Sequence, residues 1–420
     1  MYNYPMHIYG FITTVLFLIL LPFIYISRSV SGKFLYGWKE KLGFFKVSEL
    51  GKKVIMYHGV SVGEVIALEN LIKKTKETFT DYKIVVTTGT KTGQDIARKK
   101  YGDIVDYITY FPFDIPFCVK RFLSKINPSI VMIAETELWP NFAYYCNQKN
   151  IPLFIINGRI SDATYNSYKR MKFFFKRILK FYTGIYTQSL YDNKKLINIG
   201  SAPDKTVVMK NLKFDIKKSK EKIDMGTGRI IIAGSTHKGE DEIILNSFSI
   251  LKKEFSDIKL LLAPRHLNRI SNVTESVKSY NLLYGFRSKD ANFNDKDIII
   301  LDTLGELGKM YQICNFAFIG GSFNKTGGHN PLEAVVYSKP VISGPSVHNF
   351  RDIYGILTHS KAGKIVKTPE ELTDYMHKLL SDKNFYDQRS KNCETIFNDQ
   401  QGAKEFVIER IKKTLAEPKE

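Results

Sequence analysis

The segment K-V-I-M-Y-H-G-V-S-V-G-E, residues 53–64, decides the fold. Its first part, Lys53–Tyr57, is an apolar run of β-rich composition, and the stretch that follows the segment, Val65–Thr78, has helical spacing. A strand, a glycine turn and a helix N-terminus together favour an anion, because backbone N–H groups are free there and the helix dipole is positive. The segment therefore predicts one strand–turn–helix unit of an α/β domain, with an anion site at the turn.

A second turn of this kind, G-G-S-F-N-K-T-G-G-H-N-P-L-E, occupies residues 320–333. Strand and helix patterns alternate in both halves of the chain, which predicts two parallel, doubly wound sheets. The predicted strands are Lys53–Tyr57, Lys83–Thr87, Ser129–Ala134, Leu153–Ile156, Arg229–Ala233, Ile258–Ala263, Asp297–Leu301, Phe316–Ile319 and Pro340–Ile342. The predicted helices of the first half are Val65–Thr78, Gln94–Tyr101, Phe117–Ile126 and Trp139–Lys149.

The length of 420 residues favours two domains over a single core. We therefore expect an α/β protein of the GT-B class, in which two Rossmann-like domains have a substrate cleft between them and follow a membrane anchor helix. The expected boundaries are an anchor at 1–28, an N-terminal domain at 29–216, a polar linker at 217–228 and a C-terminal domain at 229–420.

The N-terminal stretch Ile8–Ile26 is apolar and carries no charge. As a helix it spans roughly 28 Å, close to the hydrocarbon thickness of a bilayer. No Lys or Arg precedes it, whereas Arg28, Lys33, Lys39 and Lys41 follow, so the positive-inside rule places the rest of the chain in the cytoplasm. A cleaved signal peptide and an interfacial helix are the alternatives, and the usual leading cations and small-residue cleavage site of a signal peptide are not present.

The formal net charge of +20 implies acidic partners: nucleic acid, anionic lipid or a phosphorylated substrate. The segment Tyr168–Tyr182 alternates cations and aromatic residues on helical spacing. It predicts either a helix packed on the core by its aromatic side or a surface that binds anionic headgroups. A nucleic-acid face is a third interpretation, but no nucleic-acid motif accompanies the segment.

Two acidic motifs of the first half are candidate catalytic groups. Glu64 lies in the first turn of a predicted helix, where a carboxylate serves as a general base on a hydroxyl or closes a capping box with Ser61. Glu135 and Glu137 follow the strand that ends at Ala134. Either one serves the cleft while the other caps the helix around Trp139, or both are solvated.

Three segments of the second half are candidate nucleotide sites. Residues 234–239 follow a strand as phosphate loops do, although Glu240 stands where a Walker motif needs Lys. Arg265 also follows a strand and suits bidentate binding of a phosphate. Asn330 is a predicted N-cap, and Glu333 then either accepts hydrogen bonds from a ribose or complements the helix dipole.

The pair Asp295 and Asp297 resembles a metal-binding D-x-D motif, but it lies in a polar loop away from the glycine turns. We interpret it as a solvated turn. No other metal-ligand cluster is evident, so we expect no metal and no cofactor.

The chain resembles the bacterial 3-deoxy-D-manno-oct-2-ulosonic acid (Kdo) transferases of lipopolysaccharide biosynthesis. The resemblance runs from the anchor to near the end, through the motifs H-G-V-S-V-G-E, T-T-G-T-K-T-G, F-P-F-D, E-T-E-L-W-P-N, I-N-G-R-I-S, N-L-K-F-D, A-G-S-T-H, P-R-H, G-E-L, G-G-S-F and G-G-H-N-P-L-E-A. It implies a GT-B enzyme, anchored in the inner membrane and facing the cytoplasm, that moves Kdo from CMP-Kdo to a lipid A precursor. The family's reaction inverts the anomeric configuration and needs no metal.

The resemblance also implies roles for individual residues. Glu64 would be the general base, and Glu135 and Lys213 would stabilise the transition state. The residues that would hold CMP are Pro264, Arg265, Leu304, Gly305, Glu306, Asn330, Pro331, Leu332 and Glu333. The implied partners are CMP-Kdo, a lipid A precursor and anionic inner-membrane lipid, with no nucleic acid.

Two other functions remain open at this stage. One is a GT-B transferase that uses a UDP-sugar and a lipid acceptor. The other is a membrane-tethered nucleic-acid-binding protein, which the net charge alone favours.

Overall fold

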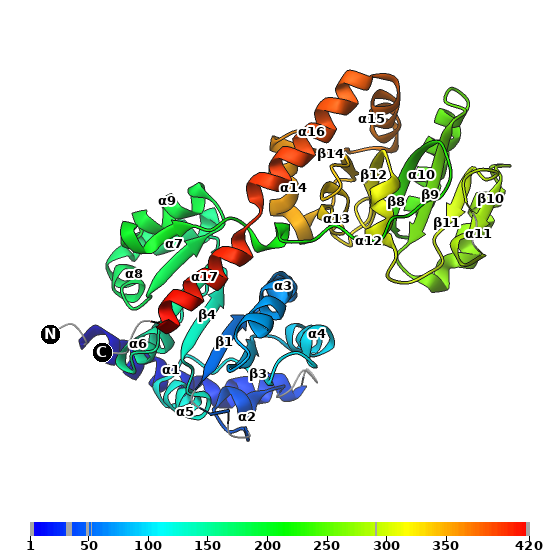
Figure 1. Ribbon diagram of the computed structural model, residues 1–420. Helices are drawn as coiled ribbons and strands as arrows, with labels where there is room; N and C mark the ends of the chain where they lie inside the picture. The colour runs from blue at the N-terminus through cyan, green and yellow to red at the C-terminus, as the bar shows by residue number, and fades with distance from the viewer. Residues whose placement is uncertain (1–3, 31–35, 48–49, 52, 290–291, 417–420) are drawn as a thin grey trace. The chain divides into compact units, whose positions relative to one another are not determined.

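The computed structural model describes residues 4–30, 36–47, 50–51, 53–289 and 292–416, and of residues 4 and 24–30 it describes the backbone alone. The protein forms two compact units: one comprises residues up to Asp215 together with those from Gln401 onward, and the other is Ile216–Gln400. Each unit contains one seven-stranded parallel sheet (Figure 1). The cation Lys33, which the sequence placed behind the anchor, lies outside the described residues.

The first sheet has the strand order β3-β2-β1-β4-β5-β6-β7. Its strands are β1 (Val54–Gly59), β2 (Lys83–Thr88), β3 (Tyr107–Tyr110), β4 (Ile130–Ala134), β5 (Leu153–Gly158), β6 (Gly184–Thr187) and β7 (Thr206–Val208). The chain leaves β1 toward β2 on one side and later returns to β4 on the other side. The sheet therefore has its topological switch point between β1 and β4, where ligands bind in such folds.

The continuous apolar run of β1 follows from burial on both faces of the sheet. Val54 and Met56 belong to one hydrophobic cluster, whereas Ile55 and Tyr57 belong to the cluster on the opposite face. A parallel sheet covered by helices on both faces requires such runs in place of alternating polar residues.

The helices of the first unit cover both faces of its sheet (Figure 1). They are α1 (Tyr4–Val30), α2 (Trp38–Lys41), α3 (Val62–Thr78), α4 (Lys91–Tyr101), α5 (Pro116–Ile126), α6 (Pro140–Gln148), α7 (Asp162–Arg170), α8 (Lys172–Leu179), α9 (Leu190–Asn198) and α17 (Ala403–Ala416). Short 3₁₀ turns lie at η1 (Pro203–Lys205) and η2 (Leu212–Phe214).

The last helix, α17, packs on the first unit, whereas the sequence assigned everything from 229 to 420 to the C-terminal domain. Val407, Ile408 and Ile411 enter the hydrophobic cluster that also holds residues of α3 and β1. The carboxylate of Asp215 accepts hydrogen bonds from the backbone N–H groups of Gly402 (2.9 Å) and Lys404 (2.5 Å) at the start of this helix. Apolar burial and a cap from the first unit thus hold the chain's end there.

The second sheet has the order β10-β11-β9-β8-β12-β13-β14. Its strands are β8 (Arg229–Thr236), β9 (Ile258–Pro264), β10 (Tyr284–Phe286), β11 (Ile298–Ile300), β12 (Phe316–Ile319), β13 (Val341–Ser343) and β14 (Gly363–Ile365). Its helices are α10 (Glu240–Lys252), α11 (Ile270–Lys278), α12 (Leu307–Met310), α13 (Leu332–Val335), α14 (Arg351–His359), α15 (Pro369–Ser381) and α16 (Lys383–Gln400), with 3₁₀ turns η3 (Leu267–Arg269), η4 (Arg287–Lys289), η5 (Tyr311–Ile313) and η6 (His348–Phe350). The switch point of this sheet lies between β8 and β12.

The sequence predicted nine of the strands within a few residues and missed five: β3, β6, β7, β10 and β14. The missed strands have three or four residues each, lie toward the sheet edges, and mix glycine, lysine or threonine with apolar residues. Such short segments have no periodicity of their own, and pairing with a neighbour defines them.

The apolar helix α1 contains Pro5–Phe23, which is long and apolar enough to cross a membrane, with a mean hydropathy of 2.0. One side of it packs on the first unit. Thr13 Oγ1 accepts a hydrogen bond from Asn141 Nδ2 at 3.3 Å, and the Phe17 ring lies 5.5 Å from that of Phe113. Its other side exposes large apolar side chains, including Phe11 and Leu18.

The basic, aromatic segment 168–182 forms the end of α7 and all of α8, with a break at Met171. Its aromatic residues divide between two environments. Tyr168, Phe174 and Phe175 pack against the hydrophobic cluster of the first unit, as the packed-helix interpretation predicted. Phe173, in contrast, is 71% exposed, and the Arg177 guanidinium lies 3.9 Å from its ring centroid.

Candidate active site

The acidic candidates of the first unit meet at its switch point. Glu64 follows β1, and Glu135 and Glu137 follow β4, the neighbouring strand. The charges of Glu64 and Glu135 both raise the pKa of Glu137, so each lies within electrostatic range of it. Parallel α/β sheets bind their ligands at this edge.

Glu64 is held by a network at the N-terminus of α3. Its Oε2 accepts a hydrogen bond from Val60 N at 2.8 Å, and its Oε1 accepts from Ser61 N at 3.2 Å and Ser61 Oγ at 2.6 Å. The predicted capping box is therefore present. A carboxylate has about four acceptor positions, so these three donors leave capacity for one more, such as a hydroxyl.

The two glycine turns are anion sites as predicted, but the chain's own carboxylates occupy their N–H groups. In the second turn Glu240 takes the place of a ligand: it accepts from Gly321 N at 2.6 Å and from Ser322 N and Phe323 N at 2.8 Å each. His237 N also donates to it at 2.9 Å. A side chain from another strand–helix connection therefore occupies the N–H groups of residues 321–323.

Glu135 has a left-handed backbone conformation, with φ +56°. Its N–H continues the sheet by donating to Ile156 O at 2.9 Å. A non-glycine residue in this region costs of order 1 kcal/mol or more, and such residues cluster at functional sites. The turn directs the chain out of β4 at the point where the sheet receives ligands.

Glu137 has a raised pKa, which the sequence did not indicate. Burial, followed by the charges of Glu64 and Glu135, raises its pKa to about 7. It does not cap α6, contrary to one predicted alternative: Asp114 of the F-P-F-D motif accepts from Asn141 N at 3.0 Å and Phe142 N at 2.8 Å instead. Glu137 therefore gains or loses its own proton near neutral pH, beside the catalytic candidates.

We expect Glu137→Gln to stabilise the protein more at pH 8 than at pH 5. A carboxyl whose folded pKa is raised binds its proton more tightly in the native state, so stability falls as pH rises from about 4.5 to about 7. The glutamine variant does not lose stability in this way, because glutamine does not ionise. Because Glu137 is only half-buried, solvent screening limits the effect to about 1 kcal/mol, or roughly 2–4 °C in Tm. Thermal melts at the two pH values measure it, and an equal Tm difference at both would contradict the assignment.

Lys213 lies in η2, beyond the last strand of the first sheet. Two contacts tie this turn to the sheet edge: Leu212 N donates to Asn157 Oδ1 at the end of β5 at 3.0 Å, and Asn70 Nδ2 of α3 donates to Asp215 O at 3.1 Å. The segment that carries Lys213 thus packs beside α3, the helix whose first turn contains Glu64.

A cavity of about 240 Å³ lies beside the acidic residues. It is lined by Glu135, Thr136, Glu137, Arg159, Ile160, Ser161 and Thr164. Thr136 Oγ1 donates to Arg159 O at 2.5 Å and accepts from Arg159 N at 3.0 Å, which joins the end of β4 to the loop after β5. Arg159 is a second residue that sequence reasoning did not select, although it lies in the quoted motif I-N-G-R-I-S.

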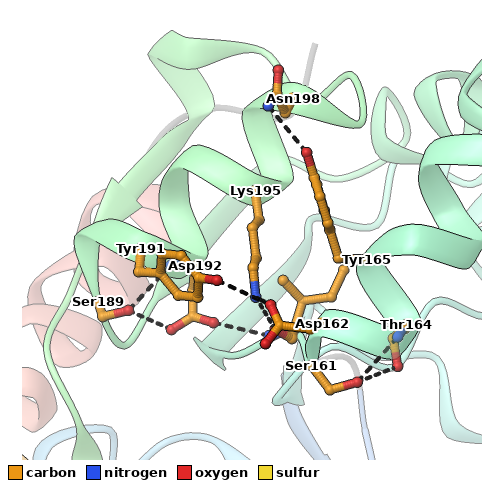
Figure 2. A network of polar contacts seen from close by, with 10 residues as sticks. Ser161, Asp162, Thr164, Tyr165, Ser189, Tyr191, Asp192, Lys195 and Asn198 are labelled. Carbon is orange, nitrogen blue, oxygen red and sulfur yellow. Dashed lines mark hydrogen bonds and ion pairs between the residues drawn. The ribbon is translucent and has the colours of Figure 1, made fainter.

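A polar network fixes the loop after β5 from the side of α9. Figure 2 shows Lys195 pointing from α9 to Asp162, with Nζ 2.6 Å from Oδ1, and the same Nζ donates to Ile160 O at 3.2 Å. Asp192 accepts from Ile160 N at 3.0 Å. Lys195 is buried, so its ammonium group is fixed in position between Asp162 and the Ile160 carbonyl. The network positions one wall of the cavity. It joins residues more than 30 positions apart, so sequence spacing does not indicate it.

The candidate CMP residues all lie in the second unit, after β9, after β11 and after β12. Pro264 ends β9, and Arg265 is exposed beyond it, with its N–H bonded to Thr236 O at 2.9 Å. Leu304 is 79% exposed and Gly305 has φ +81°, so this turn presents backbone to solvent.

Glu306 is held in place by several donors. Thr303 donates to its carboxylate, and Lys309 and Arg287 pair with it at 3.2 Å and 3.6 Å. The Thr303 hydrogen bond first, together with these cations, lowers the pKa of Glu306. The carboxylate is therefore charged and oriented.

The predicted helix start is displaced by one residue: the N-cap of α13 is Pro331 and not Asn330, because the first helical N–H groups donate to the Pro331 carbonyl. Asn330 Oδ1 accepts from Leu332 N at 3.1 Å and its Nδ2 donates to Glu333 Oε1 at 3.5 Å, while Pro331 and Leu332 are buried beneath. The helix itself is only four residues long, so Glu333 stands near both of its ends.

Asp295 and Asp297, the D-x-D pair, are each held by a cation. Asp295 pairs with Lys296 at 2.9 Å and Asp297 with Lys252 at 3.0 Å, so Asp297 is ion-paired and not simply solvated. Among the residues that the structure describes, no group of three or more His, Cys, Asp or Glu side chains is arranged to hold a metal ion.

Comparison with known proteins connects this arrangement to one family. A family model described as 3-deoxy-D-manno-octulosonic-acid transferase matches residues 36–216. The 3-deoxy-D-manno-octulosonic acid transferase of Haemophilus influenzae is 32% identical over 388 residues, which cover 90% of this chain and 91% of that protein. The corresponding transferase of Rickettsia bellii is 31% identical over 425 residues, with coverages of 98% and 97%.

Other relatives differ in length or share the fold alone. A bifunctional glycosyltransferase/methyltransferase of Fusobacterium nucleatum is 35% identical over 79% of this chain, which spans about half (53%) of that relative. MurG of Acinetobacter baumannii, at 12% identity, aligns with a TM-score of 0.55 over 86% of this chain and 99% of its own. A UDP-N-acetylglucosamine 2-epimerase, at 14% identity, aligns with a TM-score of 0.55 over 88% and 97%. These structures confirm the predicted fold class.

The matches to these two relatives cover 90% and 98% of the chain, so they include both units. The protein is therefore a glycosyltransferase that belongs to the 3-deoxy-D-manno-octulosonic acid transferase family.

Proposed function

We propose that the protein transfers Kdo from CMP-Kdo to a lipid A precursor, with inversion and without a metal, at the cytoplasmic face of the inner membrane. Family membership supports the transferred sugar, and the convergence of Glu64 with Glu135 at one switch point is the observation that carries the chemistry. A second sheet edge with Arg265 and the Asn330 turn suits the nucleotide of the donor.

In the proposed mechanism Glu64 removes the proton of the acceptor hydroxyl. The three donors around it hold both oxygens in a fixed orientation, and the remaining acceptor position takes the hydroxyl hydrogen. As the bond from C2 of Kdo to the phosphate breaks, C2 becomes electron-poor and the phosphate gains charge. Glu135 then stabilises the developing positive charge, while Lys213 and Arg265 stabilise negative charge.

Product analysis tests this function. The full-length protein in detergent is incubated with CMP-Kdo and a defined lipid A precursor, and mass spectrometry of the lipid measures the addition of Kdo. We expect Kdo addition with CMP-Kdo and none with a UDP-sugar, and unchanged turnover in EDTA. Nuclear magnetic resonance of the product gives the anomeric configuration. Transfer from the UDP-sugar alone, or activity lost in EDTA and restored by magnesium, would refute the corresponding part of the proposal.

The membrane location rests on α1 and on the segment 171–177. The exposed side of α1 is apolar, and Met171, between α7 and α8, and Phe173, in the first turn of α8, are exposed as well. Arg177 lies over the Phe173 ring, an arrangement that lets an apolar ring enter a bilayer while the cation remains at the headgroups. We propose that both elements contact anionic lipid.

Deleting residues 1–28 should leave a protein that still binds CMP and turns over detergent-dispersed acceptor. Its Tm should fall, because α1 covers Phe113 and contacts Asn141 in the full chain. The truncated protein should still co-sediment with anionic vesicles at low salt and be released at high salt, since Phe173 and the nearby cations remain.

The matched control is the same truncation with Phe173→Ser, which should lose the residual vesicle binding. If the truncated protein ignores anionic vesicles at low salt, the segment 171–177 is an ordinary packed element and α1 alone sets membrane residence.

A further inference from the structure

Three histidines lie at the switch point of the second sheet. Each belongs to one of the motifs quoted above, and none of the three has a role in the proposed function. His237 follows β8, His266 follows β9, and His329 lies between β12 and α13. The strands β8 and β12 are neighbours at the switch point, and β9 pairs with β8 on its other side. The three side chains therefore gather at the edge that receives ligands.

Two of these histidines are hydrogen-bonded to each other through their ring nitrogens. His237 Nε2 lies 2.9 Å from His329 Nε2, and the ring planes differ by 11°. His266 approaches His237 edge-on, with the ring centroids 5.6 Å apart. A hydrogen bond between two imidazole nitrogens needs one proton between them, so the pair accommodates one extra proton and not two.

The surroundings keep that extra proton off the pair in the unliganded protein. Burial, followed by Arg265, His237 and His266, lowers the pKa of His329 to about 4. Burial is also the largest cause that lowers the pKa of His237; Glu240 acts in the opposite direction, and His266, Arg269 and Arg265 lower the pKa further. The charged and titratable groups around the pair are Glu240 and Asp241 of α10, Arg265 and His266 after β9, Arg269 of η3, and His348 of η6 beside Gly327.

The carboxylates of the two acidic neighbours are engaged by other donors. Four backbone N–H groups donate to Glu240, and Arg269 pairs with Asp241. The exposed Arg265 places a positive charge near the histidine pair, and that charge lowers the pKa of His329. An anion placed here compensates that charge and restores the affinity of the pair for a proton.

We propose that His237 and His329, with His266 beside them, form a proton-linked phosphate subsite that takes up one proton when the nucleotide phosphate binds. The inference rests on the proposed function, because it takes CMP as the ligand.

In the reaction the bond from C2 to the phosphate oxygen breaks and its electron pair stays on the phosphate. The acceptor oxygen bonds to C2, and the acceptor's proton passes to the base. The phosphate thus gains one charge, which the imidazolium of the pair offsets with a proton from solvent.

Isothermal titration of the full-length protein with CMP at pH 7.5 tests this inference. Two buffers of different ionisation enthalpy give the number of protons taken up, because the observed heat contains that number times the buffer enthalpy. We expect uptake approaching one proton, and a Kd for CMP that rises up to about tenfold per pH unit above neutrality. Above pH 7 the phosphate is itself largely ionised, since its second pKa is about 6.

Variants and probes identify the groups involved. His237→Gln and His329→Gln should each abolish the proton uptake and raise Kd about tenfold, as expected for the loss of a charged hydrogen bond. His377→Gln, a surface change on α15 of the same unit, should change neither quantity. Cytidine, which lacks the phosphate, should bind without proton uptake, and free Kdo, which offers a carboxylate instead, should cause none.

Three results would overturn the inference. If the unaltered protein binds CMP without proton uptake, the inference is wrong, and this result needs no variant. The proposed function would still stand. Uptake that persists in His237→Gln and His329→Gln places the titrating group elsewhere. A protein that does not bind CMP at all refutes the donor assignment of the proposed function together with this inference.

Discussion

Glu64→Gln nearly abolishes transfer, with an expected fall in kcat of about 10²–10⁴-fold, the range for removal of a general base. Glutamine keeps the shape of the side chain and one acceptor oxygen toward Val60 or Ser61, but it does not take up the hydroxyl proton. The nucleotide candidates lie in the other unit, so the Kd for CMP should remain close to that of the unaltered protein. Initial rates of Kdo transfer and titration with CMP measure the two quantities.

The capping box makes a control necessary, because Glu64 also stabilises the start of α3. Ser61→Ala removes the N-cap side chain and leaves the Glu64 carboxylate in place. Loss of an N-cap costs about 1 kcal/mol, so this variant should melt earlier than the unaltered protein yet keep its transfer rate within about tenfold. If both variants melt earlier and both stay active, Glu64 is a capping residue only and the catalytic assignment is wrong.

Arg265→Ala and Glu333→Ala form the second prediction: each weakens CMP binding while the protein stays folded. Arg265 is exposed beyond β9, so its truncation leaves the core unchanged. A lost charge-assisted hydrogen bond costs about 1.5–3 kcal/mol, which corresponds to roughly 10–150-fold in Kd. Titration with CMP measures the loss directly.

Two variants of the same unit, at residues outside the candidate nucleotide site, are the matched controls. Arg389→Ala removes an arginine that lies over the Phe385 ring, and Glu254→Ala removes a glutamate paired with His377. Neither should change the Kd for CMP. If Arg265→Ala and Glu333→Ala bind CMP as well as the controls do, the nucleotide site lies at another part of the second unit.

Several features follow from local sequence. The strand–turn–helix unit at residues 53–78 and the position of Glu64 in the first helical turn depend on neighbouring residues, and the structure contains both. The same holds for Asn330, whose side chain accepts from Leu332 N two residues away. Such contacts join residues two to four positions apart, and spacing along the chain encodes them directly.

Strand order lies beyond local spacing, and it decides the site. Glu64 and Glu137 lie 73 positions apart, and they interact because β4 lies beside β1. This juxtaposition raises the pKa of Glu137 to about 7, which no pattern around Glu137 indicates. The cap of α6 likewise comes from Asp114, 27 positions before Asn141.

The sequence by itself determined two α/β halves, their glycine turns and the acidic residues at their strand ends. Only the tertiary structure decided that Glu240 fills the second turn, that α17 returns to the first unit, and that His237 bonds to His329. The physical reason is that a periodic pattern specifies which face of an element is buried. It does not specify which distant donor or apolar surface meets that face, and those pairings depend on the order in which the strands and helices pack.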